Sequence, residues 1–160
     1  MRTHAKKLVI AMLAGAAMLT MSGTALASTT FTTNLTGANE VPGPGDPNGK
    51  GEVFVAVKKQ KRKVCFILEF RRIGDPTAAH IHKGGPDDAG PVKVLLFEDS
   101  EGLPSPGAVE GCVRRVKKKI VRQLSRNPQK FYVNVHNDEY PDGAIRGQLG
   151  FNPATSSAAS

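Results

Sequence analysis

The stretch EVFVAVKKQKRKVCFILEF, residues 52–70, contains two apolar segments separated by a basic one. Residues 52–57 and 64–70 are rich in valine, isoleucine and phenylalanine, which favour β-strands. Between them lies KKQKRK, residues 58–63, which carries five positive charges and no apolar side chain. The stretch therefore predicts two adjacent strands that form a hairpin with a basic tip.

The rest of the chain repeats this pattern of short strands and turn-forming residues. Residues 40–51, EVPGPGDPNGKG, contain four glycines and three prolines, so they predict a loop without regular structure. Further strands are predicted over residues 30–37, 77–82, 91–97, 130–136 and 143–151.

One segment has a helical pattern instead. Val116, Ile120, Val121 and Leu124 recur at intervals of three and four residues, which predicts an amphipathic helix over about residues 116–127. The helix should end before Pro128, because a proline disfavours helical geometry in the residue that precedes it. Seven strands and one helix, without strand–helix–strand alternation, predict an all-β, immunoglobulin-like antiparallel sandwich or barrel.

The two ends of the chain differ from this central part. Residues 1–27 combine a basic start, the apolar run LVIAMLAGAAMLTM and a final Ala-Leu-Ala, which together predict a secretory signal peptide. We therefore expect a secreted or periplasmic protein with no membrane span after cleavage. One domain is predicted over residues 28–151, and the small polar residues 152–160 predict a disordered tail.

The chain has two cysteines, Cys65 and Cys112. An even number of cysteines in an exported protein predicts a disulfide bond. The alternative is two free buried thiols, which would require a reducing compartment.

Three of the four histidines lie in two of the predicted strands, TAAHIH (77–82) and FYVNVH (131–136). Side chains alternate between the two sides of a strand, so the apolar residues of each strand face the core and the polar ones face away from it. The predicted polar set is His80, His82, Tyr132, Asn134, His136, Arg146 and Gln148. The three histidines are therefore not expected in the core.

A metal site is one interpretation of these histidines. His80 and His82 have Cα atoms about 6.6 Å apart along an extended strand, so their rings could share one ion. His136 could supply a third nitrogen at about 2.0–2.1 Å, which suits Zn²⁺ or Cu²⁺. Carboxylates of the adjoining loops could add an oxygen ligand or orient a ring: Asp87, Asp88, Asp138, Glu139 and Asp142. The other interpretation is structural, with the rings hydrogen-bonded to nearby turns or exposed on the surface.

Several motifs, taken in order, resemble one known family. GANEVPG, TAAHIHKGGPDDAGPV, GCV and NPQKFYVNVHNDEYPDGAIRGQL are similar to the CHRD domain, first described as a repeated module of chordin. The resemblance covers about residues 31–151 and includes stand-alone secreted bacterial members. It implies a compact extracellular β domain of immunoglobulin-like type, with no established biochemical activity in bacteria.

The resemblance also marks particular positions of this sequence. The characteristic residues are Glu40, His80, His82, Gly90, Pro91, Asn134, His136, Pro141, Gly143, Ile145, Arg146 and Gly147. Cys65 and Cys112 match a pair that is common among bacterial members. The chain departs from the family pattern at Asn137, where threonine is frequent, and in its many lysines and arginines.

Two classes of function follow from these observations. The first is a non-enzymatic binding or structural module for an unknown extracellular protein or polymer. Its site would contain His80, His82 and His136, supported by Glu40, Asn134, Asp138 and Arg146. The second is a metal-binding protein or an enzyme similar to copper–zinc superoxide dismutase, which also carries a His-x-His strand. A bridged dismutase site normally uses more than three histidines, so an enzyme is the less favoured hypothesis.

Basic residues cluster in Lys58–Lys63 and Arg114–Lys119, and the formal net charge of the chain is +8. These clusters predict either a solvated surface or weak binding to anionic surfaces. No aromatic residue lies within them, so bases would have no stacking platform, and nucleic acid is not an expected partner.

Overall fold

The computed structural model describes residues 28–150. The signal peptide predicted over 1–27 and the tail predicted over 152–160 lie outside the described residues. The strands are β1 Thr29–Thr36, β2 Lys50–Lys58, β3 Lys63–Arg71, β4 Pro76–Lys83, β5 Val92–Glu98, β6 Gly107–Val113, β7 Phe131–Asn137 and β8 Ile145–Gln148. One α-helix, α1 Lys118–Arg126, and two short 3₁₀ helices, η1 Gly37–Asn39 and η2 Pro128–Lys130, complete the described part.

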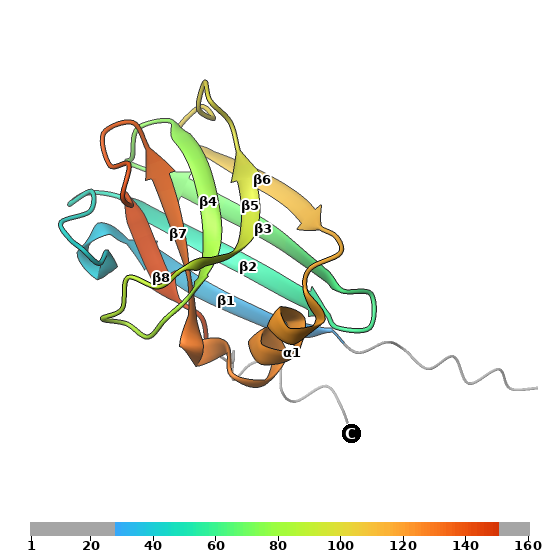
Figure 1. The fold of residues 1–160 in the computed structure, drawn as a ribbon. Helices are drawn as coiled ribbons and strands as arrows, with labels where there is room; N and C mark the ends of the chain where they lie inside the picture. Colours follow the sequence, from blue (N-terminus) through green and yellow to red (C-terminus); the bar gives the residue numbers. More distant parts are fainter. Residues whose placement is uncertain (1–27, 151–160) are drawn as a thin grey trace, which may run out of the picture.

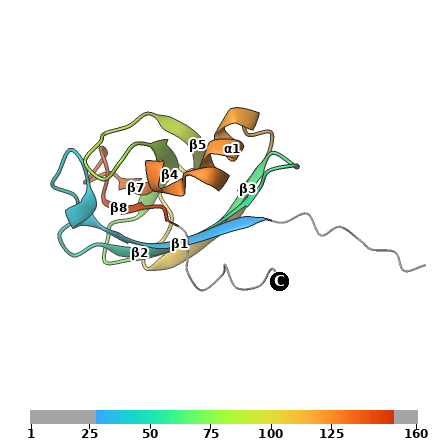
Figure 2. The same ribbon diagram turned by 90° about the horizontal axis from the view of Figure 1, so that it is seen from below.

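All eight strands belong to one antiparallel sheet. Its order is β5-β4-β7-β8-β1-β2-β3-β6. The sheet curves until its two edge strands, β5 and β6, come close to each other, so the barrel is nearly closed (Figures 1 and 2). The predicted antiparallel β fold with one helix is confirmed, and of the two arrangements considered, the strands form the barrel.

The β2–β3 hairpin is confirmed, with Lys58 opposite Lys63 at its tip. Alternate residues of both strands point into the barrel and are almost completely buried: Val53, Val55, Val57, Val64, Phe66, Leu68 and Phe70. Burial of each such side chain is worth about 1.5–3 kcal/mol relative to leaving it in water. The two strands predicted in the sequence thus supply seven of the buried side chains of the barrel core.

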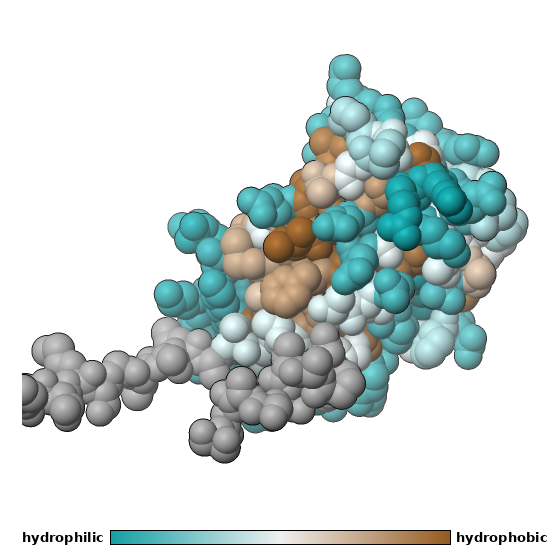
Figure 3. All heavy atoms as spheres, turned by 180° about the vertical axis from the view of Figure 1, so that it is seen from behind, coloured by the Kyte–Doolittle hydropathy of each residue, from teal (hydrophilic) through white to brown (hydrophobic). Residues whose placement is uncertain are grey.

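The outer side of the hairpin is not uniformly polar. Phe54 and Ile67 lie opposite each other in the sheet and are 38% and 44% exposed. Figure 3 shows the face behind that of Figure 1, where apolar side chains gather among polar ones.

Helix α1 closes one end of the barrel (Figure 2). Its three buried residues, Ile120, Val121 and Leu124, belong to the main hydrophobic core. The helix is shorter than predicted, because Val116 lies before it and donates its backbone N–H to the carbonyl of Arg62 instead. It ends before the proline as predicted.

Strand β6 was not predicted from the sequence. Its residues, GAVEGCV, include two glycines and a glutamate, and none of them is fully buried. Within residues 28–150, β6 pairs only with β3, so as an edge strand it lacks the continuous apolar side that marks the inner strands. The structure therefore has eight strands where the sequence predicted about seven.

The predicted disulfide between Cys65 and Cys112 is confirmed. The two cysteines lie opposite each other on β3 and β6. The bond therefore fastens the edge strand to its only neighbour in the sheet. No helix in the described part of the chain combines the length and the apolar character needed to cross a membrane.

We expect that replacing Cys65 and Cys112 together by alanine lowers the free energy of unfolding by up to about 4 kcal/mol, because the bond closes a long loop in the unfolded chain. Urea unfolding followed by circular dichroism is the measurement. Reducing the native protein should reproduce the effect, and the double variant should not respond to reductant. Equal midpoints for the variant and the oxidised native protein would contradict the prediction.

Candidate metal centre on the outer face of the sheet

The register of β4, β7 and β8 brings the predicted polar residues together. Residues directly opposite each other in antiparallel strands point to the same side of the sheet. Row by row, the outward residues are Ala78 and His136; His80, Asn134 and Arg146; and His82, Tyr132 and Gln148. We call this surface the polar face. It lies outside the barrel, whereas Ile81, Val133 and Ile145 point into the core.

Three histidines converge on the polar face, and we call His80, His82 and His136 the three-histidine cluster. One ring nitrogen from each lies within 4.8 Å of the others. The closest pair is His80 Nδ1 and His136 Nε2, at 3.1 Å. Two nitrogens that bind one ion at about 2.0–2.1 Å are separated by no more than about 4.2 Å. The close pair already meets this condition, and a small ring movement would bring in the third nitrogen.

The other ring nitrogens of two members are held by loop carbonyls. His82 Nδ1 lies 2.7 Å from the carbonyl oxygen of Gly90, and His136 Nδ1 lies 2.8 Å from that of Pro141. A carbonyl oxygen only accepts hydrogen bonds, so both Nδ1 atoms carry the proton and both Nε2 atoms carry a lone pair. The lone pair of His136 Nε2 accepts the hydrogen bond that His80 Nδ1 donates. His82 Nε2 is buried without a hydrogen-bond partner. This tautomer and this backbone contact are typical of histidines that bind metal.

Burial keeps the cluster uncharged near neutral pH. It lowers the pKa of all three imidazoles. For His80 the pKa falls to about 4, because burial is reinforced by the neighbouring His136 and His82. Metal ions bind the neutral imidazole, so at pH 7 no ring has to lose a cationic proton. Binding through His80 Nδ1 would require only that this ring change tautomer and release its hydrogen bond to His136.

A buried arginine holds a loop over the polar face. Arg146 is only 1% exposed. Its Nη2 donates to the carbonyl oxygens of Gly85, at 2.7 Å, and Asp88, at 3.1 Å. Its guanidinium carbon lies 3.4 Å from the centre of the Tyr132 ring. A buried charge is costly unless it is hydrogen-bonded, so these contacts fix residues 84–91, which we call the covering loop.

Two further residues of the polar face support the covering loop. Gln148 Nε2 donates to the Gly84 carbonyl oxygen at 2.9 Å, and the Tyr132 hydroxyl accepts a hydrogen bond from the Gly90 backbone N–H at 3.0 Å. The Tyr132 ring also stacks on His82. Sequence alternation placed both residues on the polar face, but nothing in their local pattern identified them as part of the site.

Glu40 is buried near Arg146 and packs against Gly143. Its side chain is 6% exposed, and its Oε1 has no hydrogen-bond partner. Burial raises the pKa of its carboxyl to about 7, although the positive charge of Arg146 and the backbone amide of Val41 act in the opposite direction. Gly143 has a φ of +148°, and a Cβ there would lie 2.5 Å from the Glu40 carboxyl carbon. The backbone of Gly143 thus makes room for this carboxyl group.

The loop carboxylates considered as extra ligands are not part of the cluster. Asp138 and Glu139 are exposed after β7, as are Asp87 and Asp142 in their loops. Asp88 Oδ2 accepts a hydrogen bond from the Gly85 backbone N–H within the covering loop, at 2.8 Å. The group that the described residues offer to a metal ion is therefore built from imidazoles.

Comparison with known proteins identifies one family. The sequence model of the CHRD domain matches residues 31–149, which include the barrel strands from Phe31 onward and the whole polar face. The chain has no significant match to a curated protein or to a solved structure.

We expect Gly143→Ala to lower the free energy of unfolding by about 1–3 kcal/mol, because the new methyl group meets Glu40 and the positive φ disfavours a side chain. Gly150→Ala is the matched control, since a Cβ at Gly150 has no atom within 4 Å. Equal thermal stability of the two variants would contradict this account of Gly143.

The carboxyl group of Glu40 should give a measurable dependence of stability on pH. Because its pKa is raised from 4.5 to about 7, the stability it contributes is complete below pH 4.5 and is lost as the pH rises through about 7. The histidines act in the opposite direction, since their lowered pKa values make folding less favourable as the pH falls below 6.5.

A comparison with Glu40→Gln separates the two effects. We expect the variant to gain stability relative to the native protein as the pH rises from 4.5 to above 7, by no more than about 3 kcal/mol. Chemical unfolding of both proteins across this range is the measurement. Parallel stability curves would show that Glu40 is not titrating in this window.

Proposed function

Because the chain belongs to the CHRD domain family, we propose that it is an exported, non-enzymatic binding domain whose three-histidine cluster holds one Zn²⁺ or Cu²⁺ ion. The observation that carries the proposal is the environment of the two ring nitrogens of His82. Its Nδ1 is hydrogen-bonded to a backbone carbonyl, while its Nε2 is buried and has no partner at hydrogen-bond geometry, although the Asn134 side chain lies near enough to influence the pKa of the ring. A bound cation would satisfy that nitrogen.

The three nitrogen donors support a single metal ion that is intermediate between hard and soft. Three neutral imidazoles suit Zn²⁺ or Cu²⁺ better than the oxygen-preferring Mg²⁺ or Ca²⁺. They also leave a fourth coordination position for a ligand from solution. His80 and His136 are only partly buried, so such a ligand could approach from that side. We infer that a carboxylate or imidazole of an extracellular partner could occupy this position.

The two alternatives make different demands on the same residues. In the structural alternative, His82 and His136 only fasten loops through Gly90 and Pro141. His80 is then held by its hydrogen bond to His136, and the buried His82 Nε2 is left without a role. In the dismutase-like alternative, a second ion is needed, but the described residues gather three imidazoles and no carboxylate at the cluster. The single-ion proposal accounts for the most observations.

Export is the other part of the proposal. It is supported by the signal-peptide pattern of residues 1–27 and by the disulfide between Cys65 and Cys112, since such bonds persist mainly in oxidising compartments. N-terminal sequencing of the protein from culture medium and periplasm would test it. A mature chain that starts near Ser28 is the expected result.

Metal content of the untagged protein tests the site directly. We expect one equivalent of Zn²⁺ or Cu²⁺ after incubation and desalting, measured by mass spectrometry of the metal, and a higher melting temperature than that of the chelator-treated protein. Alanine at His80, His82 or His136 should each weaken binding by at least about tenfold. Lys59→Ala, on the exposed hairpin tip, is the control and should bind like the native protein.

Two outcomes separate the alternatives. No uptake of either ion by folded protein would rule out the metal site and leave the structural role. In that case His82→Ala should still lower the melting temperature, because it releases the Gly90 carbonyl of the covering loop. Uptake of two ions per chain would instead support the dismutase-like hypothesis.

A further inference from the structure

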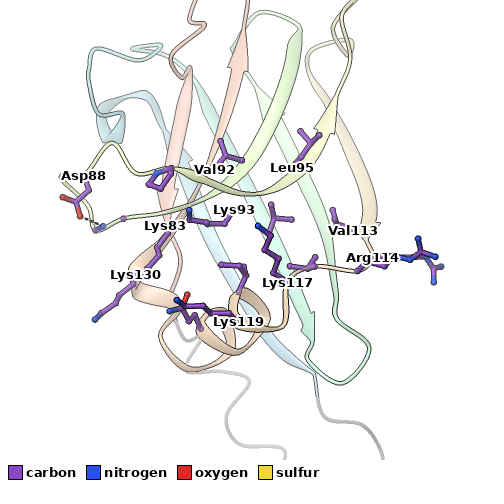
Figure 4. Close-up of a pocket in the computed structure, with 18 residues that line it drawn as sticks. Lys83, Asp88, Val92, Lys93, Leu95, Val113, Arg114, Lys117, Lys119 and Lys130 are labelled. Carbon is purple, nitrogen blue, oxygen red and sulfur yellow. Dashed lines mark hydrogen bonds between the residues drawn. The ribbon is translucent and has the colours of Figure 1, made fainter.

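The barrel has an open side between its two edge strands. β5 and β6 approach each other but are not hydrogen-bonded as neighbours in the sheet. Beside the first half of β5, a groove of about 1140 Å³ separates Val92–Leu95 from residues 113–117, and α1 lines it as well (Figure 4). The groove is distinct from the three-histidine cluster, because none of its lining residues belongs to that cluster.

The groove is strongly cationic. It is lined by Lys83, Lys93, Lys117, Lys119 and Lys130, together with two arginines of the 113–117 segment. The single acidic residue in its lining, Asp88, already accepts a hydrogen bond from a backbone N–H of the covering loop. The lysines come from β4, β5, the segment before α1, α1 itself and η2 (Figure 4). The fold therefore collects positive charge from five places at one opening, which favours an anionic ligand.

The wall along β5 combines apolar side chains with unpaired backbone. Val92 and Leu95 are 49% and 45% exposed, which is unusual for large aliphatic residues of this chain. β5 pairs with β4 alone in the described part of the chain, so the edge toward the groove has no strand partner there. An edge strand of this kind can accept an additional strand through main-chain hydrogen bonds.

We propose that this groove binds an extended acidic peptide segment of a partner protein, which adds to the edge of β5 at Val92–Leu95. Side chains of an added strand alternate between two directions. Val92 and Leu95 lie opposite His82 and His80 and share one side of the sheet, because the register of β5 shifts between them. Aliphatic residues on that side of the added strand would cover them, and acidic residues on its other side would face the lysines of the groove. A sugar polymer or a nucleic acid fits less well, because no aromatic residue lines the groove to stack on its rings.

A synthetic peptide can test the mode of binding. The probe is a fluorescein-labelled peptide of alternating Glu and Val, as long as the seven-residue β5, and its binding to the full chain is measured by fluorescence anisotropy. Polyglutamate of the same length should bind at least about tenfold more weakly, since it lacks the aliphatic residues. Methylation of alternate backbone nitrogens of the probe, on the edge that pairs with β5, should also abolish most of the binding, because it removes hydrogen-bond donors.

Matched variants locate the binding surface. Lys93→Glu combined with Lys117→Glu should weaken binding by at least about tenfold, because two lining cations become anions. Lys59→Glu combined with Lys61→Glu changes the net charge by the same amount, but at the hairpin tip. This control should lower the affinity for the peptide only slightly, through the smaller net positive charge of the protein. Leu95→Ser tests the apolar contact, and its exposed side chain makes unfolding an unsuitable explanation for a loss of binding.

The results distinguish addition of a peptide strand to β5 from binding by charge alone. The proposal is overturned if polyglutamate or an anionic polysaccharide binds as tightly as the alternating peptide, or if the hairpin-tip variant loses as much affinity as the groove variant. It is also overturned if the native protein does not bind the probe. Native protein stripped of metal by a chelator should bind the peptide as tightly as the metal-loaded protein, so this proposal and the metal site fail independently.

Discussion

Burial of the Arg146 guanidinium is the constraint on which the outer site depends. A charged group that is removed from water must have its hydrogen bonds satisfied. The backbone carbonyls of Gly85 and Asp88 do this for Nη2, and the Tyr132 ring covers the flat surface of the guanidinium, whereas Nη1 is buried without a hydrogen-bond partner. The covering loop is therefore held against the sheet. As a result, a row of polar residues that strand alternation directs away from the core is nevertheless buried.

The histidines acquire their chemical character from this covering. Because the loop is in place, the Gly90 carbonyl reaches His82 Nδ1 and selects the tautomer with a free Nε2. Pro141 has the same effect on His136 from a different loop. Loss of water around the rings lowers their pKa values, so the neutral, ligand-competent form is favoured. The loops thus prepare the cluster for an ion, and the sheet alone would not.

The two candidate sites lie on different parts of the barrel, one where the sheet is continuous and one where it is open. Across β4, β7 and β8 the sheet is continuous, and its outside is sealed by the covering loop. Between β5 and β6 the sheet remains open, α1 adds its apolar side to the core, and a disulfide fastens β6 to β3. The closed side gathers neutral imidazoles, whereas the open side gathers lysines. A small metal ion suits the first, and an extended acidic segment suits the second.

The amino-acid sequence by itself determined the positions of seven of the eight strands, the outward faces of β4, β7 and β8, the helix and the disulfide. Each depends on local composition, local spacing or a simple count: segments rich in valine, isoleucine and phenylalanine for β2 and β3, intervals of three and four residues for α1, and two cysteines for the bond. Strand β6 was missed because its edge position leaves it without a continuous apolar side. The tertiary structure alone decided whether His136 lies beside His80. More than fifty residues separate them in the chain, and only the register of β7 against β4 places their nitrogens 3.1 Å apart. The burial of Arg146 and Glu40 likewise depends on loops that close over the sheet, which strand alternation cannot reveal.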